Sequence, residues 1–250
     1  MATVSTIEWT EETWNPVTGC SKVSAGCDNC YAELMARRLH AMGVSGYENG
    51  FEISLMPRRL KQPLQRNKPT RYFVNSMSDL FHEEVPDDFI DKVLSIIKKT
   101  PHHTYQILTK RSARLVEYFG SNPLPPNIWI GVTVENKLSG LPRIDHLRNV
   151  NAEVRFLSIE PLLEDLGVID LSGIHWVIVG GESGPKARPM DEKWVLSVKS
   201  QCDIYGSAFF FKQWGAWGVD KVRRNKKANG RSLLGRKWED YPDVGVIARI

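Results

Sequence analysis

Three of the four cysteines of the chain, Cys20, Cys27 and Cys30, lie within eleven residues, and Cys202 is far away in the sequence. Their spacing is CxxxxxxCxxC, and a CxxC pair can place two thiolates on one metal centre. In a chain of 250 residues, clustered cysteines bind metal or carry out redox chemistry more often than they form a disulfide framework. The spacing therefore predicts a metal centre.

Two kinds of metal centre fit three cysteines. A four-iron cluster bound by three thiolates leaves one iron open to an outside ligand, which makes catalysis available. A structural zinc ion needs a fourth ligand, for which His40 and Cys202 are the nearest candidates. Cys202 lies on an apolar helical stripe, where a free cysteine is usually a small hydrophobic residue. The spacing favours the cluster and leaves zinc as the alternative.

The elements that position the cysteines follow an alternating pattern. Short apolar runs rich in β-branched and aromatic residues predict strands at 72–74, 105–108, 128–134, 154–159, 176–179 and 208–211, with a further short one near 13–17. Helical spacing predicts helices at 31–42, directly after Cys30, at 87–99 with Asp87 as its cap, and around 115–119 and 194–202. Because this alternation is typical of βα units, we expect an α/β fold: a partial (βα) barrel of about six parallel strands, with an open doubly wound sheet as the alternative.

Polar residues follow each of the six predicted strands. The carboxyl ends of parallel strands meet at one rim, and that rim carries the ligand site in α/β folds. Polar residues also begin ordinary loops, but their repetition after every strand favours a site. The groups are Asn75, Ser76, Ser78 and Asp79; Thr109, Lys110 and Arg111; Glu135 and Asn136; Glu160; Gly180, Gly181, Glu182 and Ser183; and Lys212, Gln213 and Trp214.

Positive charge is concentrated near the C-terminus. Eight basic residues and no acidic ones lie between Lys221 and Lys237, so the rest of the chain is net negative although the whole carries +4. We expect a partial-barrel catalytic domain at 1–214 and a basic extension at 215–250, packed on the barrel or trailing from it. Such a segment can neutralise phosphates, and its alternative is a solvated tail.

Several classes of protein are excluded. With 42% hydrophobic and 25% charged residues, the composition is that of a globular protein rather than a disordered, collagen-like or coiled-coil chain. No apolar run approaches the roughly 20 residues of a membrane span, and the polar, acidic segment 1–12 lacks the features of a secretory signal. We therefore expect a cytoplasmic protein without a membrane partner.

The cysteine segments, 13–20 (TWNPVTGC) and 26–33 (GCDNCYAE), resemble the phage-associated three-cysteine family of unassigned function that is grouped with radical S-adenosylmethionine enzymes. The resemblance extends along almost the whole chain. The further matching segments are 73–82 (FVNSMSDLFH), 108–111 (LTKR), 156–162 (FLSIEPL), 179–184 (VGGESG) and 210–215 (FFKQWG).

This resemblance implies a partial barrel, a four-iron four-sulfur cluster on Cys20, Cys27 and Cys30, S-adenosylmethionine on the open iron, and an electron donor. The protein's task is then to hold cofactor and substrate in register. The residues expected at the cofactor are Tyr31, Asn75, Ser76, Asp79, Thr109, Lys110, Glu160, Gly180, Gly181, Glu182 and Ser183. Those expected at the substrate are Lys212, Gln213 and Trp214, and no residue is assigned a catalytic role.

The chain departs from the wider superfamily in three places. Six residues lie between the first two cysteines, which is three more than in the usual CxxxCxxC spacing. Asn29 stands where an aromatic residue usually precedes the last cysteine, and Tyr31 follows that cysteine instead. The Gly-Gly-Glu sequence, usually found after an early strand, follows a late one at 180–182.

The first hypothesis is a radical S-adenosylmethionine enzyme that modifies a nucleobase or nucleotide, within phage or bacterial DNA. Its nucleic-acid half depends on the phage association and the basic segment. One alternative is a zinc- or cluster-stabilised nucleic-acid-binding protein without catalysis. Another is a radical enzyme that acts on a small free metabolite.

Overall fold

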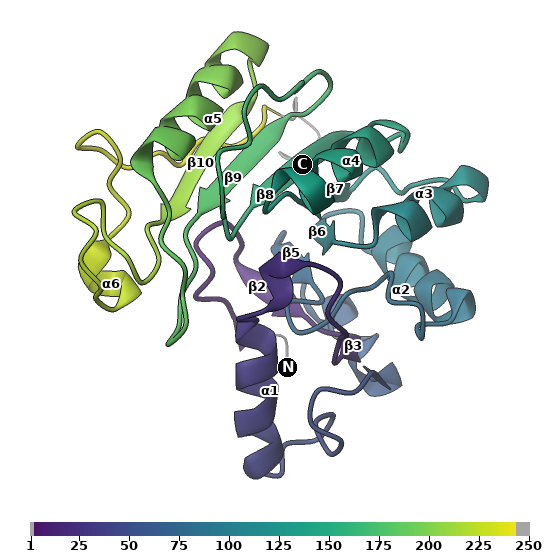
Figure 1. The fold of residues 1–250 in the computed structure, drawn as a ribbon. Helices are drawn as coiled ribbons and strands as arrows, with labels where there is room; N and C mark the ends of the chain where they lie inside the picture. Colours follow the sequence, from purple (N-terminus) through teal and green to yellow (C-terminus); the bar gives the residue numbers. More distant parts are fainter. Residues whose placement is uncertain (1–2, 244–250) are drawn as a thin grey trace.

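One curled sheet organises the chain in the computed structural model, which describes residues 3–243 (Figure 1). Its strand order is β1-β2-β5-β6-β7-β8-β9-β10. The short β1 (Thr3–Val4) pairs antiparallel with β2 (Glu12–Trp14), and the other neighbours pair in parallel. The remaining bounds are β5 (Arg71–Val74), β6 (Thr104–Thr109), β7 (Ile128–Thr133), β8 (Val154–Ile159), β9 (Trp176–Gly180) and β10 (Ala208–Gln213).

The partial barrel is thereby confirmed, with seven parallel strands rather than about six. The seventh is β2, which forms from the first part of the short strand predicted near 13–17 and pairs with β5. The second part of that segment instead becomes β3 (Val17–Thr18), which forms a separate small sheet with β4 (Ser54–Leu55).

Four helices join successive strands and cover the outer face of the sheet: α2 (Asp87–Lys99), α3 (Ser112–Ser121), α4 (Lys137–Arg148) and α5 (Glu192–Tyr205). The predicted helix at 87–99 is confirmed, but Pro86 rather than Asp87 is its N-cap. Sequence patterns missed α4 because Gly140 and Pro142 interrupt it. Gly140 is required there, since a Cβ atom would lie 2.8 Å from the Cα atom of Val134.

The two faces of the sheet pack differently. The outer face contributes aliphatic side chains such as Ile107, Ile130 and Val177 to the core beneath the helices. The inner face, near the amino ends of the strands, is filled by an aromatic cluster, which we call the aromatic floor. It consists of Trp9, Phe73, Trp129, Phe156, Trp176 and Phe210. The floor fills the inner face at this end of the half-barrel, so a ligand site on that face lies toward the carboxyl ends of the strands.

The helix after the cysteines, α1 (Tyr31–Ala41), extends away from the sheet (Figure 1). The helix predicted at 31–42 is confirmed, and several of its large apolar side chains face solvent: the exposed fractions are 55% for Tyr31, 41% for Leu34 and 42% for Met35. The helix packs instead through Ala32 and Ala36. Small side chains allow close approach to the neighbouring segment, which leaves the larger ones in solvent.

The described part of the C-terminal extension packs against the edge strand β10. Phe211 donates its backbone N–H to the Trp238 carbonyl at 2.9 Å, and Arg231 donates through Nε to the Lys212 carbonyl at 3.0 Å. The four-residue helix α6 (Lys226–Asn229) lies in this extension. The end of the extension predicted at 215–250, residues 244–250, lies outside the described residues. Within residues 3–243, no helix has the length and apolar character of a membrane span.

Candidate functional site

A polar layer lies above the aromatic floor on the inner face of the sheet. Side chains alternate between faces along a strand, so inward-facing residues two apart rise from the floor toward the carboxyl ends. Thr133 pairs in register with Ser158 in this layer, and the Nζ atom of Lys110 lies 3.4 Å from the Thr133 hydroxyl. The sheet therefore changes from aromatic to polar where a ligand would enter.

The next layer brings predicted residues from three strands into contact. The Glu160 carboxylate after β8 accepts hydrogen bonds from Lys212 Nζ at 2.7 Å and Gln213 Nε2 at 3.1 Å, both from β10. It lies against Gly180, where a Cβ atom would come within 3.1 Å of it. Gln213 also lies 3.3 Å from the Ser183 hydroxyl. The Glu160 and Lys212 side chains are 18% and 14% exposed, so a ligand can still reach them.

The loop that carries the cysteines, residues 19–30, lies across these carboxyl ends (Figure 1). Gly19 forms a parallel bridge with Ser78 after β5, and Gly26 packs against Glu135 after β7. This cysteine loop then reaches the segment after β9, where Asn29 donates to the Lys186 carbonyl at 3.0 Å. The predicted metal ligands are thus held over the rim where the polar residues converge.

One ionic cluster fixes the start of the cysteine loop. Asp79 is buried, and its carboxylate accepts hydrogen bonds from the Thr109 hydroxyl at 2.7 Å and the Lys110 backbone N–H at 3.1 Å. Arg111 lies 3.4 Å from the same carboxylate, donates to the Ser21 hydroxyl at 2.8 Å, and reaches the Cys20 sulfur at 3.5 Å. We call Asp79, Thr109 and Arg111 the first clamp.

A second ionic cluster fixes the end of the loop. Glu182 accepts a two-pronged pair of hydrogen bonds from the Arg188 guanidinium at 2.6 and 2.9 Å, and one from the Asn29 amide at 3.0 Å. Arg188 also donates to the Ala25 carbonyl at 2.8 Å and pairs with Asp28 at 3.2 Å. Burial opposes ionisation of Glu182, but the hydrogen bonds from Arg188 and Asn29 hold its pKa below the ordinary value. Glu182 and Arg188 form the second clamp.

The glycines after β9 permit contact between backbones of the same chain. A Cβ atom on Gly181 would lie 2.0 Å from the Trp214 carbonyl oxygen, and one on Gly215 would lie 2.2 Å from the Glu182 carbonyl oxygen. The segments after β9 and β10 therefore cross in direct contact, which any larger residue would prevent. A role of Gly180 and Gly181 at the cofactor stays a prediction.

Three further predicted residues, Tyr31, Asn75 and Ser76, lie at the rim near the start of α1. The Tyr31 hydroxyl donates to the Ser76 carbonyl. Asn75 is buried at a φ of 59°, and its Oδ1 accepts from the Val17 backbone N–H at 3.2 Å. Its buried Nδ2 has no hydrogen-bond partner among the described residues. A buried donor without a partner is costly, and the role of Asn75 at the cofactor stays a prediction.

Trp214 is placed differently from its predicted position at the substrate. Its ring is buried in the outer core, 4.9 Å from the ring of Phe211, and its Nε1 donates to the Ser232 carbonyl at 2.8 Å. Packing accounts for this tryptophan, and no face of it is left for stacking on a base.

The two candidate metal centres make different demands on the three cysteines. Zinc requires its ligands about 2.0–2.3 Å from one ion, whereas a four-iron cluster takes each thiolate on a different iron and so needs them further apart. No group of three or more His, Cys, Asp or Glu side chains within residues 3–243 is arranged around a single ion. Cys20, Cys27 and Cys30 are free, partly exposed thiols at the rim.

Neither proposed fourth zinc ligand joins the three cysteines. Cys202 is fully buried in the core under α5, where burial raises the pKa of its thiol to about 12. His40 lies ten residues beyond Cys30, about 15 Å along α1, and its Nδ1 is 2.8 Å from the Tyr47 carbonyl oxygen. Both side chains are held by contacts of their own. Neither therefore acts as a fourth ligand beside the three cysteines.

Residues 4–242 match the family model described as protein of unknown function (DUF5131). The chain belongs to this family. None of the curated proteins compared with the DUF5131 chain matches it.

Among solved structures, a spore photoproduct lyase mutant with dinucleoside spore photoproduct is 13% identical with a TM-score of 0.49. A second mutant of that lyase, with bound AdoMet and dinucleoside spore photoproduct, is 13% identical with a TM-score of 0.45. Each match covers 80% of the DUF5131 chain and 63% of the lyase, so the chain spans less than two thirds of the length of these neighbours. At these identities and TM-scores, the function has to be argued from the residues of the chain itself.

Sequence reasoning missed two arginines of the DUF5131 site. Arg188 lies in an irregular loop, and no periodicity or spacing connects it with Glu182. Arg143 pairs with the fully buried Glu135 at 2.7 Å and donates to the Thr133 carbonyl at 2.8 Å. It lies on α4, the helix that the pattern missed. Glu135 itself could be found because it directly follows a predicted strand.

Proposed function

We propose that this DUF5131 protein is an iron–sulfur enzyme of the radical S-adenosylmethionine type that acts on a nucleobase or nucleotide. The observation that carries the proposal is the position of Cys20, Cys27 and Cys30, clamped over the polar rim of a half-barrel and joined by neither proposed fourth ligand. The resemblance of the cysteine segments to the three-cysteine family supports the same assignment.

The three cysteines are the residues that would hold the cluster. The chemistry that such a cluster supplies is one-electron reductive cleavage of S-adenosylmethionine, which yields a 5′-deoxyadenosyl radical able to remove hydrogen from a substrate. Burial raises the pKa of the Cys20 thiol to about 11, the Asp79 carboxylate adds to this, and Arg111 opposes it. Cys20 must therefore lose a proton when metal binds, and Arg111 stabilises the resulting thiolate.

Glu160 and Lys212 are the residues best placed for the amino-acid end of S-adenosylmethionine. That end carries one ammonium and one carboxylate group, and the two side chains present the complementary charges 2.7 Å apart. The aromatic floor below excludes water from the other end, which protects a radical from side reactions.

Asp79 and Glu182 take a different part in this proposal. Their carboxylate oxygens are engaged by donors of the same chain, so we assign them to holding the cysteine loop rather than to the cofactor. The remaining predicted contacts, Tyr31, Ser76, Thr109, Lys110 and Ser183, lie around the same rim and stay predictions.

Anaerobic metal analysis tests the proposal. After reconstitution with iron and sulfide, we expect about four irons and four sulfides per chain, and an electron paramagnetic resonance signal of the reduced protein that changes when S-adenosylmethionine is added. Stoichiometric zinc without iron under the same conditions would contradict the proposal. It would favour the nucleic-acid-binding alternative without catalysis.

A further inference from the structure

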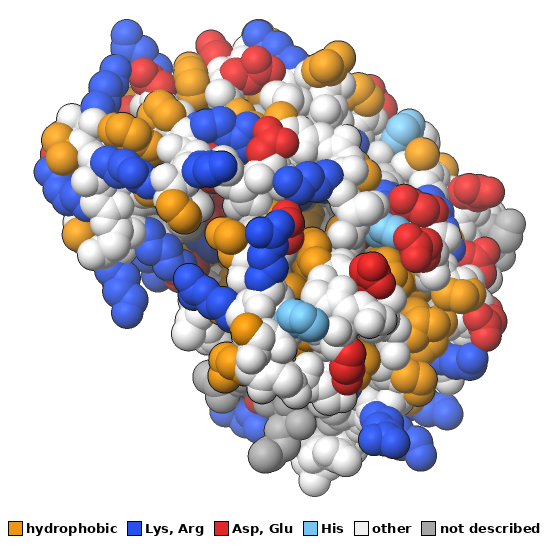
Figure 2. Space-filling model, turned by 60° about the horizontal axis from the view of Figure 1, so that its bottom comes forward, with side chains coloured by type: hydrophobic (Ala, Val, Ile, Leu, Met, Phe, Trp, Pro, Cys, Tyr) orange, Lys and Arg blue, Asp and Glu red, His pale blue; other side chains and the backbone are white. Residues whose placement is uncertain are grey.

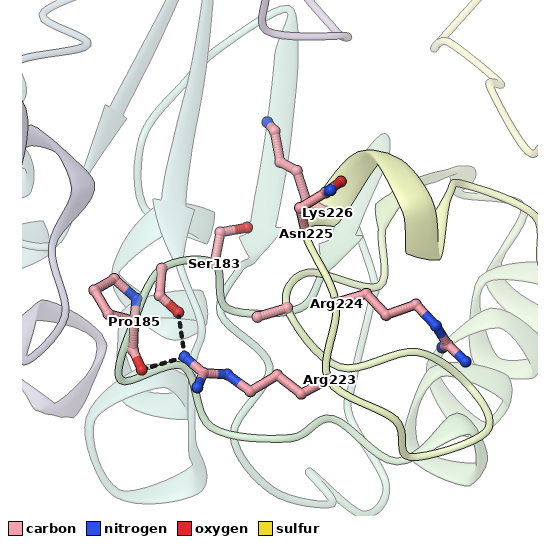
Figure 3. Close-up of a pocket in the computed structure, with 8 residues that line it drawn as sticks. Ser183, Pro185, Arg223, Arg224, Asn225 and Lys226 are labelled. Carbon is pink, nitrogen blue, oxygen red and sulfur yellow. Dashed lines mark hydrogen bonds between the residues drawn. The ribbon is translucent and has the colours of Figure 1, made fainter.

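Two cavities adjoin beside the cysteine loop. The larger, of about 490 Å³, lies between residues 183–185, which follow β9, and residues 223–226 of the basic extension (Figure 3). The smaller, of about 360 Å³, is lined by Cys30 and Lys186 and shares Ser183 and Pro185 with the first. One short segment therefore separates a cavity in the basic extension from one that reaches a predicted metal ligand.

The larger cavity carries positive charge without acidic residues in its lining. Arg224 is neutralised by Asp220, with hydrogen bonds of 2.9 and 2.6 Å, and points away from Ser183 in Figure 3. Arg223 reaches across the cavity but donates to the uncharged carbonyl oxygens of Gly184 and Pro185. The side-chain ammonium of Lys226 has no hydrogen-bond or ion-pair partner among residues 3–243, while its backbone carbonyl accepts from the Gly230 N–H at 3.1 Å. Two charges thus remain uncompensated, and Figure 2 shows Lys and Arg side chains bordering a hollow on the α6 side of the molecule.

The neutral groups of the cavity complete a set of donors. The Asn225 Oδ1 accepts from the Ala228 backbone N–H at 2.9 Å, which leaves the amide Nδ2 of Asn225 to donate outward. Ser183 lies 3.3 Å from Gln213, and Gln213 in turn bonds to Glu160 of the rim. Arginine, lysine, amide and hydroxyl donors without a carboxylate are the combination that recognises phosphate.

The size and walls of the cavity indicate more than a bare phosphate ion. A volume of about 490 Å³ is in the range of small-molecule sites, and Pro185 and Ala216 supply apolar surface beside the cations. A nucleotide combines the required anion with a flat, largely apolar base. The part of the nucleotide beyond its phosphate can extend into the adjoining cavity at Cys30.

We propose that this cavity binds the phosphate of a nucleotide, either free or within a single strand, through Lys226, Asn225 and Ser183, with Arg223 supplying positive charge at the other end of the cavity. The inference rests on the proposed function, because it assigns the phosphate site for the substrate class named there. In this proposal the basic segment acts through one defined phosphate site and not through diffuse positive charge.

Lys226 and Lys227 provide a matched pair for the test. Both are exposed, adjacent and part of α6, but only Lys226 lines the cavity. The probes are a fluorescent 5′-phosphorylated dinucleotide, the same dinucleotide without the 5′-phosphate, a nucleoside monophosphate and a single-stranded oligonucleotide. Binding to the anaerobically reconstituted protein is measured by fluorescence anisotropy or, for unlabelled probes, calorimetry, across a range of salt concentrations.

We expect Lys226→Gln to weaken binding of the phosphorylated dinucleotide about fivefold to tenfold and to reduce the salt slope by about one, whereas Lys227→Gln changes affinity less than about twofold. Removing the 5′-phosphate should weaken binding to the wild type by a similar factor, and should change the affinity of Lys226→Gln little. Binding of the monophosphate points to a free nucleotide, and binding of the oligonucleotide alone points to a strand; both support the site. Equal effects of the two variants, or no binding of any probe at low salt, would overturn it.

The proposed function and the phosphate site can fail separately. Protein that binds no iron but still binds the dinucleotide through Lys226 would contradict the proposed function and retain the site. Protein that takes up iron and responds to S-adenosylmethionine, but binds every probe equally with and without Lys226, would retain the enzyme and remove the site.

Discussion

The carboxylates at the rim of this half-barrel fall into two groups. Asp79 and Glu182 are buried, and each is engaged by several donors of the same chain, with an arginine that reaches from it to the cysteine loop. Glu160 is more exposed and accepts hydrogen bonds from Lys212 and Gln213. Among the described residues, neither of these two side chains is hydrogen-bonded to the cysteine loop. Similar chemistry at one rim therefore serves two purposes.

The two groups differ in how much hydrogen-bonding capacity each carboxylate still has for a ligand. A carboxylate whose oxygens are filled by fixed donors stabilises its surroundings and gains little from a ligand. A lysine–glutamate pair with access to solvent can exchange its partners for those of a ligand. The two clamps thus position the cysteines, and Glu160 with Lys212 remains available for binding.

The largest expected effect is at the cysteines themselves. Changing Cys20, Cys27 or Cys30 to Ala should abolish iron binding, because three thiolates are the minimum for a stable site-differentiated cluster. Iron per chain after anaerobic reconstitution measures this. Cys202→Ala is the matched control: it should keep full iron and lose only about 1 kcal/mol of unfolding free energy through the small core cavity. Loss of iron in the control would show that the ligand set is wrong.

The second clamp should come next. Glu182→Gln removes the charge that pairs with Arg188, and we expect the free energy of unfolding to fall by about 1–3 kcal/mol together with a partial loss of bound iron. Denaturant unfolding and iron analysis measure the two effects. Asp220→Asn breaks another arginine pair, but one whose side chains are 40% and 48% exposed, and should leave both nearly unchanged. A fully stable, fully loaded Glu182→Gln protein would refute the clamp.

Glu160 should separate binding from folding. Glu160→Gln keeps the size of the side chain and an oxygen that can accept from Lys212, so we expect normal iron content, a loss of only about 1 kcal/mol of unfolding free energy, and about tenfold weaker binding of S-adenosylmethionine. Equilibrium dialysis of the reconstituted protein measures the affinity. Unchanged affinity would place the amino-acid end of the cofactor elsewhere.

The smallest expected effect is at the first clamp. Arg111→Lys keeps a positive charge but is too short to preserve the contact with the Cys20 sulfur, at 3.5 Å in the present side chain. Hydrogen bonds to cluster sulfurs favour the reduced state, so the midpoint potential should fall by roughly 40 mV, equivalent to about 1 kcal/mol for one electron. A redox titration followed by electron paramagnetic resonance measures it. A potential unchanged in Arg111→Lys would make this contact purely structural.

Much of the fold could be predicted because the strands of a covered sheet are buried and leave continuous apolar runs. All six predicted strands are present with nearly the predicted bounds. The failures occur where local sequence and tertiary packing disagree. Gly140 and Pro142 interrupt the helical pattern of α4, so this helix was not predicted. In α1, Leu34 and Met35 are exposed because Ala32 and Ala36 form the contact surface, which the sequence pattern alone does not show.

The site was predictable only in part. Strand ends identified Glu160, Glu182 and Asp79, since each follows a recognisable apolar run. Whether such a residue binds a ligand or holds a loop depends on its partner, and Arg188 comes from an irregular segment that no pattern singles out. Composition and spacing find the groups that can do chemistry, but the donors around them decide which of these groups remain available.

The most direct test of the account is formation of 5′-deoxyadenosine from S-adenosylmethionine by the anaerobically reconstituted protein under a strong reductant. We expect the nucleoside to accumulate with the wild type and with Cys202→Ala, and to be absent with Cys27→Ala. A wild-type protein that carries its full iron and binds S-adenosylmethionine, yet releases no 5′-deoxyadenosine above the level of Cys27→Ala, would contradict the assignment to radical chemistry.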